Sequence, residues 1–207
     1  MIGQLYQARL EALLASGERK ILGIVGPPGS GKSTLAQAVL DHFGERAVTV
    51  PMDGFHLANR ELARLDRASR KGAEDTFDSA GYVALLRRLR TQPSDEVVYA
   101  PEFRREIEEP IANAIPVSAN TLLVITEGNY LLLDRCHWAK VRDLLDEVWY
   151  VEIDPDLRRK RLIERHEQFG RSPQAARDWV ARTDDPNAAL IESTQSRAHV
   201  LFRWEEP

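Results

Sequence analysis

Several features are scarce or absent in this sequence of 207 residues. Its one cysteine, Cys136, cannot form an intrachain disulfide, so we expect a reducing compartment, the cytoplasm. Apolar runs such as 122–125 and 131–133 are far shorter than the ~20 residues that span a bilayer. The first ten residues lack the basic and apolar regions of a signal peptide. The sequence therefore predicts neither a leader nor a membrane partner.

Positive charge is not in excess either. There are 28 Lys and Arg residues against 32 Asp and Glu, which gives a net charge of −4. Nucleic-acid binding depends on neutralising phosphates with basic patches, so the balance disfavours a nucleic-acid partner. The hydrophobic fraction of 43% and the charged fraction of 29% are ordinary for a globular protein. We expect one domain over residues 1–207, large enough to form a core without disulfides.

Short apolar runs alternate along the chain with segments of helical spacing. Alternating strands and helices predict an α/β fold with a mostly parallel central sheet and helices on both faces. Ligands of such sheets bind at the carboxyl ends of the strands. We expect strands at 20–25, 47–51, 97–100, 121–126, 147–153 and 200–204, and helices at 4–16, 33–43, 79–91, 138–145, 156–169 and 173–182. Ser79 is the expected N-cap of the third of these helices.

The first expected strand is followed by a phosphate-binding motif, Gly26-Pro-Pro-Gly-Ser-Gly-Lys-Ser33. Its glycines let backbone N–H groups turn toward phosphates, and the next helix begins there. Lys32 can reach the β- and γ-phosphates, and Ser33 can ligate Mg²⁺. The motif predicts a three-layer P-loop NTPase fold that binds ATP and Mg²⁺. The expected nucleotide-binding residues are Gly26, Pro27, Pro28, Gly29, Ser30, Gly31, Lys32, Ser33 and Thr34.

Two acidic residues follow later strands. Asp53 comes just after 47–51, where a carboxylate beside the phosphate loop can orient and deprotonate an attacking hydroxyl. The alternative is a turn aspartate that caps the next helix. Glu127 ends 121–126 as a Walker-B-type acid, expected to bind Mg²⁺ directly or through water. The alternative is an acid that merely ends a strand.

Arginines gather after the strand at 147–153. Arg158, Arg161 and Arg165 lie near one face at helical spacing. On a helical lid at about 156–172, Arg161 and Arg165 could stabilise charge in the transition state. An exposed helix also often carries such a charge run, so that interpretation stays open.

Together these segments resemble the superfamily of phosphoribulokinase, uridine kinase and bacterial pantothenate kinase over residues 20–170. The resemblance implies an ATP-dependent phosphotransferase with Asp53 as base and Glu127 in magnesium and acceptor contacts. The implied acceptor contacts also include His56, Tyr99 and Arg104. The resemblance is carried by Gly26–Ser33, Asp53–His56, Thr76–Asp78, Tyr99–Arg104, Ile125–Gly128 and Arg158–Arg165.

The acceptor segment at 101–110 lacks the basic, hydroxyl-rich continuation that is typical of uridine kinases. The sequence is most similar to the subgroup labelled as nucleoside/nucleotide or fructose-transport-system kinases. We therefore expect a fructose-like sugar as acceptor, with a nucleoside or pantothenate as alternatives. A regulatory P-loop NTPase that acts through a protein partner is the alternative of another class. The sequence leaves a homodimer open.

Overall fold

The central sheet has five parallel strands, in the order β2-β5-β1-β6-β7. The computed structural model describes residues 2–204. The predicted α/β class with a mostly parallel sheet is confirmed. The strands are β1 (Lys20–Val25), β2 (Ala47–Thr49), β5 (Leu123–Gly128), β6 (Glu147–Val151) and β7 (Val200–Phe202).

Two hydrophobic clusters cover the two faces of this sheet. Side chains alternate along β1, so Leu22 and Ile24 lie in one cluster while Ile21 and Val25 lie in the other. Helices α1 (Gln4–Leu14) and α2 (Lys32–Phe43) pack on the first face. Helices α4 (Ser79–Arg90) and α7 (Asp185–Glu192) pack on the second. The near-continuous burial of β1 and β5 follows from this two-sided cover.

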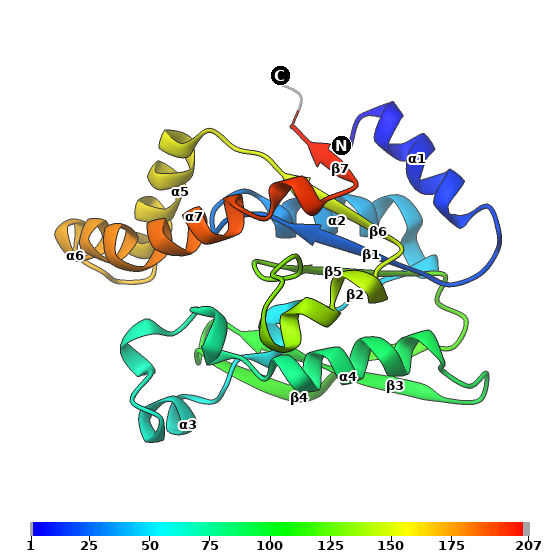
Figure 1. Cartoon of the computed structure of the whole chain (residues 1–207), viewed down its shortest axis with the longest axis horizontal. Coiled ribbons are helices and arrows are strands. Elements are labelled where there is room, and N and C mark those ends of the chain that lie inside the picture. The colour runs from blue at the N-terminus through cyan, green and yellow to red at the C-terminus, as the bar shows by residue number, and fades with distance from the viewer. Residues whose placement is uncertain (1, 205–207) are drawn as a thin grey trace.

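A separate antiparallel hairpin lies on the second face, under α4 in Figure 1. It consists of β3 (Val97–Arg104) and β4 (Glu109–Ser118). The sequence predicted a strand at 97–100 but missed β4, whose two prolines weaken a strand pattern. The register shifts between Ala100 and Glu102, which marks a β-bulge in β3.

Other boundaries differ modestly from expectation. The helix expected at 138–145 is two short 3-10 turns, at 136–140 and 142–144. The helix expected to reach 182 ends as α6 (Pro173–Trp179), followed by a π-turn at 180–184 and then by α7. The N-cap of α4 is Asp78 rather than Ser79, because its carboxylate accepts the backbone N–H of Gly81 at 2.8 Å.

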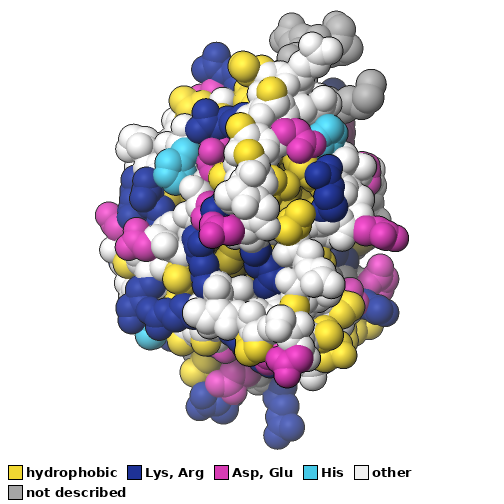
Figure 2. Space-filling view, turned by 90° about the vertical axis from the view of Figure 1, so that its right-hand side faces the viewer, with side chains coloured by type: hydrophobic (Ala, Val, Ile, Leu, Met, Phe, Trp, Pro, Cys, Tyr) yellow, Lys and Arg dark blue, Asp and Glu magenta, His cyan; other side chains and the backbone are white. Residues whose placement is uncertain are grey.

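The helices after β6 gather at one side of the sheet. Helices α5 (Pro155–Gln168) and α6 lie on the left of Figure 1, above α3 (Asn59–Arg64). Within residues 2–204, no helix combines the length and apolar character needed to cross a bilayer. On the face seen in Figure 2, Lys and Arg side chains are interspersed with acidic ones.

Candidate active site

A cavity of about 800 Å³ opens where β1, β2 and β5 end. Its wall combines the phosphate loop, the turn after β2, the β3–β4 hairpin and helix α5. The expected nucleotide residues Pro28, Gly29, Gly31, Lys32, Ser33 and Thr34 all line it. Asp53, His56, Glu127, Arg161 and Arg165 line it as well. The fold thus brings together most of the residues that the sequence had singled out from separate segments.

The phosphate loop has the conformation that its glycines allow. Gly29 and Gly31 adopt φ angles of 81° and 90°, and Gly31 directly precedes α2. The Ser30 hydroxyl is buried without a hydrogen-bond partner in the described chain, as expected for a loop that receives phosphate oxygens. Lys32 donates to the carbonyl of Pro27 at 3.0 Å. Burial lowers the pKa of Lys32, and the carboxylates of Glu127 and Asp53 oppose that shift.

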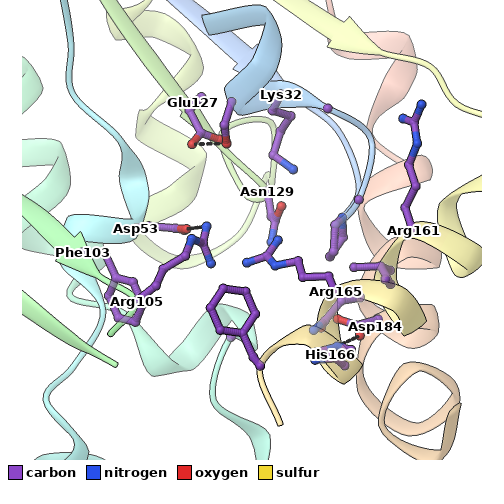
Figure 3. A pocket seen from close by; sticks show the side chains of 18 of the residues that line it. Lys32, Asp53, Phe103, Arg105, Glu127, Asn129, Arg161, Arg165, His166 and Asp184 are labelled. Carbon is purple, nitrogen blue, oxygen red and sulfur yellow. Dashed lines mark hydrogen bonds and ion pairs between the residues drawn. The ribbon is translucent and has the colours of Figure 1, made fainter. Parts of the chain in front are cut away.

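Ser33 and Glu127 meet at the end of β5. The Ser33 hydroxyl donates to a carboxylate oxygen of Glu127 at 3.0 Å (Figure 3). Burial raises the pKa of Glu127, and the charge of Asp53 adds to this, while Lys32 opposes it. Within residues 2–204, no cluster of three or more His, Cys, Asp or Glu side chains could hold a metal. One carboxylate and one hydroxyl fit Mg²⁺, which is commonly held by few protein oxygens plus substrate phosphates.

The turn after β2 places Asp53 and His56 opposite the phosphate loop. This turn is a short 3-10 helix over 52–55, packed against the bulge of the hairpin. A Cβ on Gly54 would lie 2.3 Å from the carbonyl oxygen of Pro101, so only glycine permits this close approach. The predicted alternative for Asp53, capping of the next helix, does not occur, since α3 has Ala58 as N-cap.

His56 is held in one orientation by its neighbours. Its Nδ1 lies 2.8 Å from the carbonyl oxygen of Asp53, which can only accept, so Nδ1 carries the proton. The rings of Phe77 and Phe103 lie 4.0 and 4.6 Å away, measured between centroids. Burial lowers the pKa of His56, although Asp53 opposes the shift. The neutral ring therefore offers Nε2 as a hydrogen-bond acceptor.

The three arginines of α5 that the sequence places near one face have different surroundings. Arg158 is 3% exposed and forms an ion pair with Asp185 of α7, so we interpret it as a structural residue that joins α5 to α7. Arg165 points into the centre of the cavity, whereas Arg161 runs beside the phosphate loop (Figure 3). Within residues 2–204, neither Arg161 nor Arg165 has a carboxylate within ion-pair distance of 4.0 Å, although other carboxylates line the cavity. Burial, and then repulsion by Arg105, lower the pKa of Arg165.

The hairpin contributes different residues from those expected. Tyr99 is 52% exposed outside the cavity, and Arg104 pairs with Glu102 at the surface at 2.6 Å. Phe103 and Arg105 line the cavity instead. Tyr99 precedes the bulge and lies on the outer face of β3, between the buried Val98 and Ala100. The bulge after Ala100 explains why Arg105 replaces Arg104, because one extra residue reverses which of the later side chains face inward.

Further cavity residues were missed by the sequence reasoning. Lys71 and Asn129 line the cavity, and Asn129 directly follows the recognised Glu-Gly pair. His166 of α5 lies 2.9 Å from Asp184 of the π-turn. The position of Asn129 at the end of a strand, two residues after Glu127, could have indicated it, but no local signal marks Lys71 or Asp184.

Comparisons with known proteins agree with this geometry. A model of the phosphoribulokinase/uridine kinase family matches residues 21–205. A provisionally assigned uridine kinase of Schizosaccharomyces pombe is 35% identical, over 97% of this chain and 89% of its own length. A uridine kinase of Halobacterium salinarum is 30% identical, over 87% of this chain and 78% of its own.

A solved structure extends the comparison to three dimensions. It is a provisionally assigned fructose transport system kinase from Silicibacter, with a TM-score of 0.83 and 33% identity. The match covers 94% of this chain and 98% of the other. Sequence and fold therefore point to the same group of proteins.

Proposed function

Since this chain belongs to the phosphoribulokinase/uridine kinase family, we propose that it transfers the γ-phosphoryl group of ATP to a hydroxyl of a small sugar. Family membership makes it an ATP-dependent kinase of small molecules. The acceptor and the residue roles are the proposal. The observation that carries it is the convergence of Asp53, Lys32 and Arg165 on one cavity beside the phosphate loop.

The proposed transfer begins at Asp53. Its carboxylate accepts the proton of the acceptor hydroxyl while the hydroxyl oxygen forms a bond to the γ-phosphorus. The bond from that phosphorus to the bridging oxygen breaks, and its electron pair leaves with ADP. The proton on Asp53 then passes to water. A carboxylate at the edge of a cavity, with its side chain 29% exposed, can exchange that proton.

Positive groups opposite Asp53 would offset the negative charge that develops on the phosphates during transfer. Lys32 would contact the β- and γ-phosphates, and Arg165 would approach the γ-phosphate from α5. Ser33 and Glu127 would hold Mg²⁺, which when bound shields charge on the phosphates. We propose that residues 156–172, which comprise most of α5 and the turn after it, act as a lid, because α5 carries Arg161 and Arg165 beside the loop.

The acceptor side favours a sugar over a nucleoside. Phe77 is buried, and the ring of Phe103 contacts His56 and lies 5.2 Å from the Lys71 ammonium. Both rings line the cavity, but these neighbours in the protein leave less of their surface free to stack on a base. His56 and Asn129 supply neutral polar groups that suit hydroxyls. The Silicibacter relative, described as a fructose transport system kinase, supports the same choice.

The test replaces Asp53 by asparagine and measures ATP turnover with a panel of sugars, nucleosides and pantothenate. We expect one sugar to stimulate turnover, and Asp53→Asn to lower kcat about 10²- to 10⁴-fold with the KM for ATP within threefold. Asp156→Asn, whose side chain is 92% exposed on α5, is the charge-matched control. Stimulation by a nucleoside alone would mean that the acceptor is a nucleoside and not a sugar. Hydrolysis of ATP that is independent of every acceptor would refute the kinase assignment in favour of a regulatory NTPase.

A further inference from the structure

Arg105 occupies an unexpected place for a cation. It extends from the hairpin toward Asp53, with 3.7 Å between its guanidinium and a carboxylate oxygen (Figure 3). That distance is too long for a hydrogen bond, and no other carboxylate of residues 2–204 lies within 4.0 Å of Arg105. Its fork of donors is therefore largely unused.

The ion pair with Asp53 does not account for the position of Arg105. The two side chains are 41% and 29% exposed, and a pair so accessible to water is weak. A neutral sugar would bind here without any need for such a charge. The position of Arg105 is thus explained by a ligand group rather than by Asp53 alone.

The surroundings also favour an anion next to Arg105. Arg165 faces it from α5, close enough for the two cations to repel each other, and Asp53 lies on the far side of Arg105 (Figure 3). Arg165 is on the side of Lys32 and the phosphate loop, where the nucleotide supplies negative charge. Arg105 is on the hairpin side with Phe103, across the cavity from the phosphate loop, where the proposed function puts the acceptor. We therefore expect the negative charge that binds Arg105 to belong to the acceptor.

We propose that the acceptor is an acidic sugar derivative, whose carboxylate or phosphate is bound by Arg105 close to the reacting hydroxyl. This inference rests on the proposed transfer to a sugar hydroxyl. The guanidinium fork binds either acid in two parallel hydrogen bonds. The acceptor's own charge thus selects the substrate at Arg105.

The experiment compares acids with their uncharged parents under saturating ATP and Mg²⁺. The pairs are gluconate with glucose, fructose 6-phosphate with fructose, and glycerate with glycerol. The rate of ADP release measures turnover. Each is measured on the wild type, on Arg105→Gln and on Arg105→Lys. Arg104→Gln is the matched control, since its neighbouring guanidinium lies outside the cavity and pairs with Glu102.

We expect an acidic member to exceed its parent in kcat/KM by about 10- to 100-fold, the usual range for a charged hydrogen bond. Arg105→Gln should remove that preference, Arg105→Lys should restore part of it, and Arg104→Gln should leave it unchanged. The carboxylate and phosphate arms identify which acid is used.

Preference for uncharged parents, or an acid preference that survives Arg105→Gln, overturns the inference and leaves the kinase proposal standing. If no sugar, charged or neutral, raises ADP release, the proposed function fails and the inference with it.

Discussion

Replacement of Gly29 by alanine should destabilise the protein and weaken ATP binding together. Gly29 adopts a φ of 81°, a left-handed conformation that costs an L-residue ~1–2 kcal/mol. A Cβ there would lie 2.9 Å from Cγ of Leu162 and 3.2 Å from the carbonyl oxygen of Arg158, both on α5. Leu162 is 3% exposed and cannot move away freely.

The matched control is Gly17→Ala. Gly17 has a φ of 71°, but a Cβ there would meet nothing within 4 Å. Gly17→Ala should therefore cost only the backbone strain, ~1–2 kcal/mol. Gly29→Ala adds overpacking, for which about 1–3 kcal/mol is typical, so its total should be about 2–5 kcal/mol. The difference between the variants measures how tightly the loop packs on α5.

The assay is urea unfolding followed by tryptophan fluorescence, with the KM for ATP measured on the same samples. We expect Gly29→Ala to lose more stability than Gly17→Ala and to raise the KM at least tenfold, whereas Gly17→Ala leaves the KM unchanged. Equal losses of stability with an unchanged KM in both variants would mean that α5 does not rest on the phosphate loop, and the lid proposal would lose its basis.

Three further predictions concern buried polar groups, and the same unfolding assay tests each. Thr126→Val should lower the free energy of unfolding by about 1–3 kcal/mol, and by more than Tyr82→Phe does. The reason is that the Thr126 hydroxyl is hydrogen-bonded both to the Tyr82 hydroxyl at 2.6 Å and to the Val50 carbonyl at 2.7 Å. An equal loss in the two variants would argue against this chain of hydrogen bonds. Asp185→Asn should cost ~3 kcal/mol by leaving the buried Arg158 without its partner, and a loss below ~1 kcal/mol would show that the pair is weak. His56 has a pKa lowered by burial, so the unfolded chain binds its proton more readily and the free energy of unfolding should fall as pH drops below about 6.5. His56→Gln should flatten that dependence between pH 7.5 and 5.5, and an unchanged slope would assign it to other groups.

The sequence predicted the parts of the site that are local or that end a strand. Gly26–Ser33 is one contiguous motif whose glycine and lysine positions determine its conformation and ligand. Asp53 and Glu127 were found because parallel strands deliver their carboxyl ends to one edge. The hydrogen bond between Ser33 and Glu127, 94 residues apart, agrees with the expected magnesium site, which stays a prediction.

Residues of the hairpin and of α5 could not be assigned in the same way. Counting alternate residues along β3 without its bulge puts Arg104 inward, whereas the bulge puts Arg105 there. The helical spacing of Arg158, Arg161 and Arg165 indicates a shared face. It does not indicate which of the three guanidiniums forms an ion pair with a carboxylate far away in the sequence and is therefore not free to face the cavity. Asp185 pairs with Arg158 and leaves the other two facing the cavity.

The sequence by itself determined the sheet, the phosphate loop and the lack of a basic excess, which disfavours nucleic acid, because these depend on local periodicity, a contiguous motif and composition. Tertiary structure alone decided that Arg105 and Lys71 join the expected Arg165 in the cavity. Arg105, Lys71 and Arg165 come from a hairpin, a loop and a helix, and only packing brings them to one cavity. The net charge of −4 says nothing about that local excess, because charges across the surface balance it.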